Sequence, residues 1–396
     1  MFKWISQTIA VTLLSIRTIP QRLSSSGVAM AGIAGVVIVF IAVLSIGEGF
    51  KAAMTEAGSP ERAIVLRGGA DSEMSSGIGG AEADLIRQAP GVLLDNNHPV
   101  ASAELFVIID RNKRTTGTAA NVPLRGIEPT AMQVRNQVKI TEGRMLHFGT
   151  NEAIVGKSAL MQFSGLELNS DIKSGQLSLK IVGVFEDKGS ASESELWADS
   201  KLIQDVYRRG NSYQTVLVRL DSAASFDTFK NALTTNPQLN VQVKRETEYY
   251  AAQSETMTAL IKGIGYTIAV LMGMGAVFGA ILTMNTAVSA RTREIATLRA
   301  LGFNTIAVLI SVLSESMALA AIGGLAGGLL GYAAFNGYQT STMNFQTFSQ
   351  IAFAFRVTPS LLVQGLTYAL IMGFVGGIFP AIRAARLPIP SALREL

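Results

Sequence analysis

The sequence predicts an α-helical membrane protein with four transmembrane helices and a large α+β extracytoplasmic domain between the first and second spans. Three observations predict this fold. Of the 396 residues, 48% are hydrophobic and only 16% are charged, whereas a soluble domain usually carries about 25% charged residues. Four apolar runs are long enough to cross a bilayer core of about 30 Å, which takes roughly 20 helical residues. One long, mixed segment, residues 48–262, separates the first two runs.

The four spans are assigned from runs that hold almost no charge. Three of them have none, and Ile306–Gly331 contains a single charged residue, Glu315. The first run is expected to be a permanent span, because no small-residue cleavage pattern follows it. We place the spans at residues 26–47, 263–288, 305–332 and 361–379.

The basic residues beside the spans predict the orientation. Segments 1–25, 289–304 and 380–396 together hold nine basic and two acidic residues, whereas residues 48–262 hold 23 basic and 26 acidic residues. Basic residues concentrate on the cytoplasmic side of a membrane. Both termini are therefore expected to be cytoplasmic, with residues 48–262 and the loop 333–360 on the other side.

Two cytoplasmic segments are predicted to form amphipathic helices. Residues 1–25 place apolar side chains near helical spacing beside Trp4, which favours a helix in the membrane interface over a disordered tail. Residues 289–304 combine three arginines with an apolar stripe, and Gly302 is a natural stop for the helix. Because this second helix joins two spans, it lies at the membrane surface and can contact a partner outside the bilayer.

Glu315 is the only charged residue in the four predicted spans. An intramembrane carboxylate is a functional candidate by default. Its position, two to three turns after the basic helix, equally suits a packing role in an ion pair with a nearby arginine, and we favour this second interpretation. A proton relay would need further ionisable partners, which the spans lack.

Small residues recur at four-residue spacing in the spans and allow helix backbones to approach closely. They indicate either tight packing within one four-helix unit or a seam between two copies, and the sequence leaves both open. Four helices without a polar lining are too few to enclose a channel, so oligomerisation is expected. These residues are Gly275, Gly279, Gly323, Gly327, Gly331, Gly373 and Gly377, with Gly324 and Gly328 in a second row.

Residues 48–262 are predicted to fold as an α+β domain on two helical stalks. Residues 48–57 and 246–262 continue a helical pattern into the adjoining spans. Between them, β-branched or alternating runs bounded by turn residues indicate strands. The predicted strands are 63–67, 104–110, 121–127, 152–156, 177–186 and 215–220, and the predicted short helices are 81–88, 157–163, 200–209 and 226–234.

Little in this domain indicates catalysis or metal binding. The sequence has no cysteine, and its two histidines, His98 and His147, lack metal-type spacing to other ligands. The acidic segment 189–199 is expected to be a solvated turn, and the Gly- and Ser-rich segment 68–80 a mobile loop. No catalytic, metal or nucleic-acid site is predicted. The sequence also lacks a GxxxxGK(S/T) motif, so if ATP drives this protein the motor must be another polypeptide.

Four stretches of the sequence resemble the MacB/FtsX/LolC-like family of ABC transporter permeases, in its MacB-like branch. ARTREIATLRALGF (290–303) is similar to the family's cytoplasmic coupling helix, and SESMALAAIGGLAGGLLGY (314–332) to its third span. FPAIRAARLPIPSALREL (379–396) is similar to its C-terminal ending, and EGRMLHFGTNEAIVGKSALMQF (142–163) to the periplasmic core domain. MacB itself fuses its ATPase to the permease, whereas this sequence starts almost directly at its first amphipathic helix.

The resemblance implies a non-enzymatic permease subunit in a bacterial cytoplasmic (inner) membrane. It implies two permease copies, expected as a homodimer, and two separate ATPase subunits that bind ATP and Mg²⁺, while the permease binds no cofactor. ATP-driven dimerisation of the ATPases would move the extracytoplasmic domains, a mode called mechanotransmission. The implied ATPase-coupling residues are Arg291, Arg293, Glu294, Ile295, Leu298, Arg299, Leu301 and Gly302. Arg291 and Arg293 also suit contacts with anionic membrane lipids.

The leading functional expectation is export together with a periplasmic adaptor (a membrane fusion protein) and an outer-membrane duct. Two alternatives come from the same family: a LolC-like permease for lipoprotein or lipid trafficking, and an FtsX-like regulator of a cell-wall hydrolase. A membrane-anchored sensor or structural protein outside the ABC class would leave the basic helix unexplained. No substrate pocket is legible in the sequence.

Overall fold

The computed structural model describes residue 12, residues 23–56 and residues 58–389. The chain divides into two compact units. The helical unit comprises residues 1–48, 260–337 and 356–396, and the α/β unit comprises residues 49–259 and 338–355. The N-terminal amphipathic helix predicted at residues 1–25 falls mainly on residues 1–22, of which only residue 12 is described.

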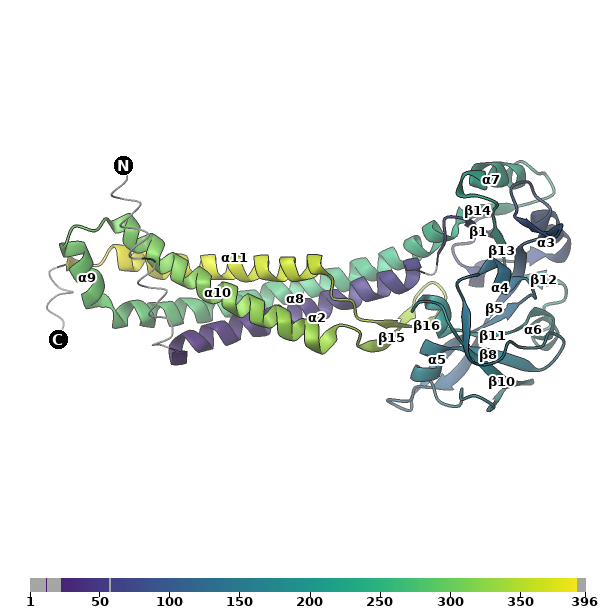
Figure 1. The fold of residues 1–396 in the computed structure, drawn as a ribbon, viewed down its shortest axis with the longest axis horizontal. Coiled ribbons are helices and arrows are strands. Elements are labelled where there is room, and N and C mark those ends of the chain that lie inside the picture. The colour runs from purple at the N-terminus through teal and green to yellow at the C-terminus, as the bar shows by residue number, and fades with distance from the viewer. Residues whose placement is uncertain (1–11, 13–22, 57, 390–396) are drawn as a thin grey trace. The chain divides into compact units, whose positions relative to one another are not determined.

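Four helices among the described residues are long and apolar enough to cross a membrane (Figure 1). They are α2 (Leu23–Glu56), α8 (Glu246–Ala290), α10 (Thr305–Phe335) and α11 (Pro359–Ala385), and the short helix α9 (Thr292–Ala300) lies between α8 and α10 in the chain. Helix α2 includes residues 48–56 of the first predicted stalk, and α8 includes the whole of the second, residues 246–262. Helix α11 continues through Pro380, past residue 379, where its span was predicted to end.

Packing within one chain accounts for most of the small residues in the spans. A methyl group at Gly327 of α10 would lie only 2.6 Å from the carbonyl oxygen of Ala34 on α2. A methyl group at Gly323, Gly373 or Gly377 would likewise lie within 2.8 Å of an atom of α2 or α10, and one at Gly331 would lie 3.3 Å from the side chain of Ile41 on α2. A methyl group at Gly275 or Gly279 on α8 would meet nothing within 4 Å. Of the two interpretations, packing within the unit therefore applies to the first group, and only the α8 pair leaves an open face.

The α/β unit is built on a ten-stranded mixed sheet. Its order is β14-β1-β13-β5-β6-β11-β8-β10-β7, with β9 added beside β10. Neighbouring strands are antiparallel except in the pairs β6–β11 and β8–β10. The strands are β1 (Arg62–Arg67), β5 (Ala101–Asn112), β6 (Ala119–Ile127), β7 (Lys139–Gly143), β8 (Glu152–Gly156), β9 (Asp171–Ser174), β10 (Leu177–Glu186), β11 (Leu196–Asp199), β13 (Thr215–Arg219) and β14 (Val241–Arg245).

Smaller elements complete the α/β unit. The two-stranded ribbons pair β2 (Ile78–Gly79) with β12 (Ser212–Tyr213), β3 (Leu94–Asp95) with β4 (His98–Pro99), and β15 (Gln339–Asn344) with β16 (Ser349–Ala354). The helices are α3 (Gly80–Arg87), α4 (Ala131–Val134), α5 (Lys157–Gln162), α6 (Ser200–Val206) and α7 (Phe226–Thr234), with 3₁₀ turns η2 (Glu73–Ser75), η3 (Ala191–Ser194) and η4 (Ala223–Ser225).

Several hydrophobic cores lie along the large sheet, and two of them contain the most residues. Alternate residues of β5, Leu105, Val107 and Ile109, belong to one core together with Phe163 after α5, because successive side chains of a strand point to opposite faces. The other core includes Phe229 of α7 and residues of β1, β13 and β14. The helices predicted from the sequence thus supply the apolar cover for the strands.

Three segments differ from the sequence predictions. The acidic segment 189–199 is not a solvated turn, because it contains strand β11 inside the large sheet. Segment 68–80 is not simply an open loop, since it contains η2 and β2. Loop 333–360 contains the hairpin β15–β16, which belongs to the α/β unit although it connects two helices of the helical unit.

Candidate functional site

Helix α9 ends in a backbone arrangement that favours glycine. The N–H of Phe303 donates to the carbonyl oxygen of Leu298 (3.2 Å), and the N–H of Gly302 donates to that of Arg299 (3.1 Å). This pair of hydrogen bonds is the Schellman motif. Gly302 has a φ of +92°, a left-handed conformation that glycine adopts without steric cost. Gly302 therefore ends the helix as the sequence predicts.

One face of α9 packs on the helical unit. The side chain of Ile295 is 7% exposed, and Ala296 is 1% exposed. Ile295 shares a hydrophobic cluster with residues of α8, α10 and α11, which are Met284, Val288, Val308, Val312, Leu319, Ala381 and Ala384. Ile295 is thus covered by its own chain, and its predicted role in ATPase coupling stays a prediction.

A buried ion pair joins the start of α9 to α10. Arg291, the residue that precedes α9, donates from Nη2 to Oε1 of Glu315. The two side chains are 11% and 4% exposed. A charge withdrawn from water is stable only where an opposite charge and hydrogen bonds replace the water. Glu315 therefore forms an ion pair with a nearby arginine, as the packing interpretation of the sequence expects. In this structure the Arg291 guanidinium is engaged with Glu315, and its predicted contact with an ATPase or with lipid stays a prediction.

A second arginine of α9 binds the chain that follows α11. Nη1 of Arg299 donates to the carbonyl oxygen of Leu387. The resemblance assigned Arg299 to a polar contact with the ATPase, but the structure uses its guanidinium inside the chain. Arg291 and Arg299 therefore fix α9 at its two ends, one to α10 and one to the segment after α11.

The remaining face of α9 is open. Arg293 and Glu294 are exposed, and Leu298 is half-buried. Neither charged side chain forms an ion pair within the part of the chain that the structure describes. Leu301, at the end of the helix, is 73% exposed. This short surface therefore presents one positive charge, one negative charge and an exposed leucine. A partner could bind it through complementary charges and through apolar contact.

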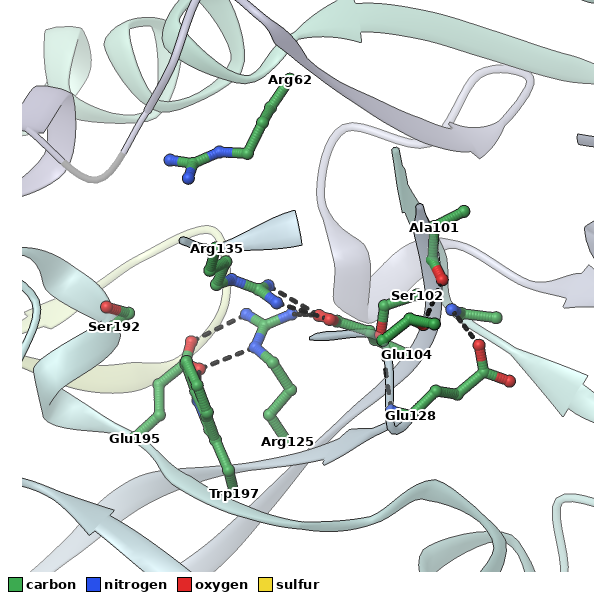
Figure 2. A network of polar contacts seen from close by, with 12 residues as sticks. Arg62, Ala101, Ser102, Glu104, Arg125, Glu128, Arg135, Ser192, Glu195 and Trp197 are labelled. Carbon is green, nitrogen blue, oxygen red and sulfur yellow. Dashed lines mark hydrogen bonds and ion pairs between the residues drawn. The ribbon is translucent and has the colours of Figure 1, made fainter. Parts of the chain in front are cut away.

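A cluster of buried charges lies in the α/β unit around Arg125 of β6 (Figure 2). Its Nη1 lies 2.7 Å from Oε1 of Glu73 and 3.1 Å from Oε2 of Glu104. Its Nε lies 2.6 Å from Oε2 of Glu195. Because one guanidinium faces three carboxylates, further cations are needed to balance the charge.

Arg135 supplies the second cation of this cluster. It binds Glu104 through both Nη atoms, at 2.5 and 2.7 Å. Burial raises the pKa of Glu104, but the charges of Arg135 and Arg125 outweigh burial, so the pKa is lowered and the group stays ionised. The Arg135 guanidinium also lies 5.3 Å from the ring centre of Trp197, whose Nε1 donates to Glu195 at 2.8 Å. Figure 2 shows Glu104 of β5, Arg125 of β6, Trp197 of β11 and Arg135, which directly follows α4, gathered in one cluster.

The first turns of α8 are anchored beside the same cluster. Glu246 lies 2.5 Å from Nε of Arg62 on β1 and accepts the N–H of Ser59 at 3.0 Å. One turn later, the hydroxyl oxygen of Tyr249 accepts the N–H of Glu73 at 3.2 Å. Burial raises the pKa of Glu246, and Arg62 offsets only part of that rise. Helix α8 is therefore held to the sheet and to η2 by buried polar contacts.

Sequence reasoning missed this cluster. Glu73 lies in the segment expected to be mobile, and Glu195 lies in the segment expected to be solvated, yet they are only 3% and 7% exposed. Their partner Arg125 is 52 and 70 residues away along the chain, so no local pattern reveals the pairing. Because each carboxylate binds a guanidinium, the cluster is an ion-pair network that orders the domain, and it is not arranged as a metal site.

Two protein-family models match this chain. The model of the MacB-like periplasmic core domain matches residues 26–236. The model of the FtsX-like permease C-terminal region matches residues 266–389, which include α9 and the ion pair between Arg291 and Glu315.

Curated relatives share about a quarter of their residues with this chain. The "uncharacterized ABC transporter permease YvrN" of Bacillus subtilis is 24% identical over 281 residues, which cover 65% of this chain and 66% of that protein. A "macrolide export ATP-binding/permease protein MacB" of Hyphomonas neptunium is 24% identical over 413 residues, which cover 98% of this chain and 61% of that protein. The chain thus spans about two thirds or less of the length of these relatives.

Two solved structures resemble part of this chain, with low TM-scores. The periplasmic region of MacB from Actinobacillus actinomycetemcomitans matches with a TM-score of 0.37 and 12% identity, over 52% of this chain and 94% of that chain. The extracellular domain of the transporter YknZ from Gram-positive bacteria matches with a TM-score of 0.36 and 16% identity, over 46% of this chain and 99% of that chain. At these TM-scores the likenesses carry no argument of their own.

Proposed function

Because the chain belongs to the family of ABC transporter permeases with a MacB-like periplasmic core domain and an FtsX-like permease C-terminal region, we propose that it converts ATP hydrolysis by ATPase subunits into motion of its α/β unit. In this proposal α9 is cytoplasmic and receives the force, and the α/β unit lies outside the cytoplasm. ATP and Mg²⁺ are bound by the ATPase, and the four spans conduct no substrate.

The division of α9 into an anchored face and a free face carries this proposal. A helix that transmits force must be fixed to the spans on one side and available to the motor on the other. Ile295, Arg291 and Arg299 fix α9 to its own chain, whereas Arg293 and Leu301 are exposed. A push on the free face would therefore move α10 and the end of α11, because the buried ion pair and the apolar cluster resist separation.

The continuity of α2 and α8 supports the output half of the proposal. Each helix contains an apolar span and continues as the same helix into residues of the α/β unit. The backbone hydrogen bonds of an unbroken helix carry displacement along its axis. The buried contacts of Glu246 and Tyr249 then attach the first turns of α8 to the sheet and to η2.

The assembly proposed from the family is a homodimer of permeases with two ATPase subunits in the bacterial inner membrane. The open face of α8 at Gly275 and Gly279 offers a place where helices of two copies can approach closely. Export is proposed because the MacB relatives are named for it, and a periplasmic adaptor and an outer-membrane duct are proposed as further partners. The distribution of basic residues supports cytoplasmic termini.

Single substitutions on the free face of α9 test the proposal. We expect Glu294→Arg and Leu301→Asp to abolish co-purification of the ABC ATPase subunits and the ATPase activity of the complex. Their thermal midpoints should stay close to that of the unchanged protein, because both side chains are exposed. Leu94→Asp is the matched control, since Leu94 is 59% exposed in the α/β unit, and it should leave association intact. ATPase binding that survives both α9 substitutions would contradict the assignment.

A further inference from the structure

The hairpin β15–β16 connects α10 to α11 but folds as part of the α/β unit. We propose that it is a third arm through which α10 and α11 act on the α/β unit, beside the continuous helices α2 and α8. This inference rests on the proposed function, because an arm matters only where force is transmitted. A connection between two helices usually needs roughly 2 to 8 residues, whereas residues 336–358 separate α10 from α11.

Side chains of the α/β unit bind backbone groups of the hairpin. The Oγ of Ser194 in η3 accepts the N–H of Ala352 on β16 at 2.8 Å, and both residues are buried. Nδ2 of Asn121 on β6 donates to the carbonyl oxygen of Phe348 in the hairpin turn at 2.8 Å. Phe348 has a φ of +51°, an uncommon value for a bulky residue that persists where surrounding contacts fix it. The hairpin is thus held in one register.

The hairpin also contacts those parts of α2 and α8 that belong to the α/β unit. Nδ2 of Asn344 donates to Oε1 of Gln253 on α8 at 3.1 Å, and both side chains are buried. The rings of Phe353 and Phe50 on α2 meet edge to face with 5.6 Å between their centres. Gly49 of α2 permits this approach, because a methyl group there would lie 2.1 Å from the carbonyl oxygen of the hairpin's last residue. One element therefore touches both continuous helices.

Hydrogen bonds join the two hairpin segments from the turn almost to the helix ends. The strand ladder pairs Gln339 through Asn344 with Ala354 through Ser349. One residue beyond the ladder on each side, the N–H of Phe355 donates to the carbonyl oxygen of Tyr338 at 2.8 Å. Next to the helices, the N–H of Val357 donates to Oδ1 of Asn336 at 3.1 Å. A displacement of α10 or α11 would therefore reach the hairpin through paired segments and not through a single flexible strand.

A disulfide tests whether the hairpin remains docked while the transporter works. The sequence has no cysteine, so Ser194→Cys with Ala352→Cys introduces a single pair. In the full complex with its ATPase, we expect the disulfide to form to the same extent without nucleotide and with ATP plus vanadate. Formation in only one of the two states would show that the hairpin leaves the domain during the cycle, and it would overturn the proposal. Each single cysteine serves as the background control.

A second experiment tests whether the docked hairpin transmits force. Spin labels on Leu94→Cys in two permease copies report the distance between the α/β units with and without ATP. We expect Asn344→Ala and Gly49→Val to keep ATPase association but to lose the ATP-dependent change in distance. The neighbouring change Phe345→Ala is the matched control, because Phe345 is 55% exposed, and it should keep the full change.

The outcomes separate this inference from the proposed function. An ATP-dependent change that persists undiminished in both hairpin variants, with normal folding by size-exclusion chromatography, overturns the third arm alone. Absence of any ATP-dependent change in the unsubstituted complex contradicts the proposed function itself. If Gly49→Val fails to fold, Asn344→Ala and the disulfide still decide the question.

Discussion

The ion pair between Arg291 and Glu315 gives the sharpest prediction, because it is the polar contact that fixes the start of α9. Removing one partner of a buried ion pair costs about 3–5 kcal/mol. At 11% and 4% exposure this pair lies near the buried limit, and Nε of Arg291 already lacks a hydrogen-bond partner. We expect Glu315→Gln to lower the free energy of unfolding by about 3 kcal/mol, at the lower end of that range because the arginine keeps some contact with water.

Each single substitution should destabilise the protein, because each leaves one mostly buried charge without its partner. The double variant should be more stable than the sum of the two single effects predicts, with a coupling of about 1–3 kcal/mol for residues in direct contact.

Denaturant unfolding in detergent micelles measures these free energies. Arg293→Gln is the matched control, because Arg293 lies two residues away and is exposed, and it should change stability by no more than about 0.5 kcal/mol. Strictly additive effects of the Arg291 and Glu315 substitutions would show that the pair does not hold α9 to α10.

Three further predictions concern other named residues. Gly302→Ala should lower the free energy of unfolding by about 1 kcal/mol and weaken ATPase binding, because alanine is strained at positive φ. The control is Gly275→Ala, which lies in a helix with open space around it and should not lower the thermal midpoint. Arg125→Gln should destabilise the α/β unit by about 3–5 kcal/mol, because it leaves three buried carboxylates without their shared cation. Differential scanning calorimetry of the full chain would detect this as a lower unfolding temperature. The pKa of Glu152 should be about 2, lowered from 4.5 chiefly by its hydrogen bonds from Arg144. The ionised Glu152 carboxylate therefore stabilises the protein above pH 4.5, and this stabilisation is lost as the pH falls toward 2. In an NMR titration, Arg144→Gln should return the pKa of Glu152 toward 4.5.

Elements with strong local signals could be predicted from the sequence. The apolar runs correspond to four long helices, and Gly302 ends α9. Strands such as 152–156 and 177–186 are found where alternation indicates them. These features depend on neighbouring residues, so a window of sequence contains the information that determines them.

Features that depend on distant partners could not be predicted in this way. Glu195 resembles a solvated acid until Arg125, on another strand, is placed beside it. Strand β15 of the hairpin is mainly polar, and the attachment of the hairpin to the α/β unit depends on distant residues such as Ser194 and Gln253. Ile295 and Arg299 suit a partner surface by type alone, but the fold turns both toward their own chain. Long-range packing determined each of these outcomes.

Proximity cross-linking from Leu301 tests the central claim, that α9 receives force from an ATPase, most directly. The sequence has no cysteine, so Leu301→Cys carries one photoreactive maleimide probe at a side chain that is 73% exposed. We expect a covalent product with the ABC ATPase subunit in the assembled complex. A probe at Leu282→Cys, on the apolar part of α8 and 68% exposed, should give none. An intact complex that yields no product from position 301, or equal product from both positions, would show that α9 does not bind the ATPase.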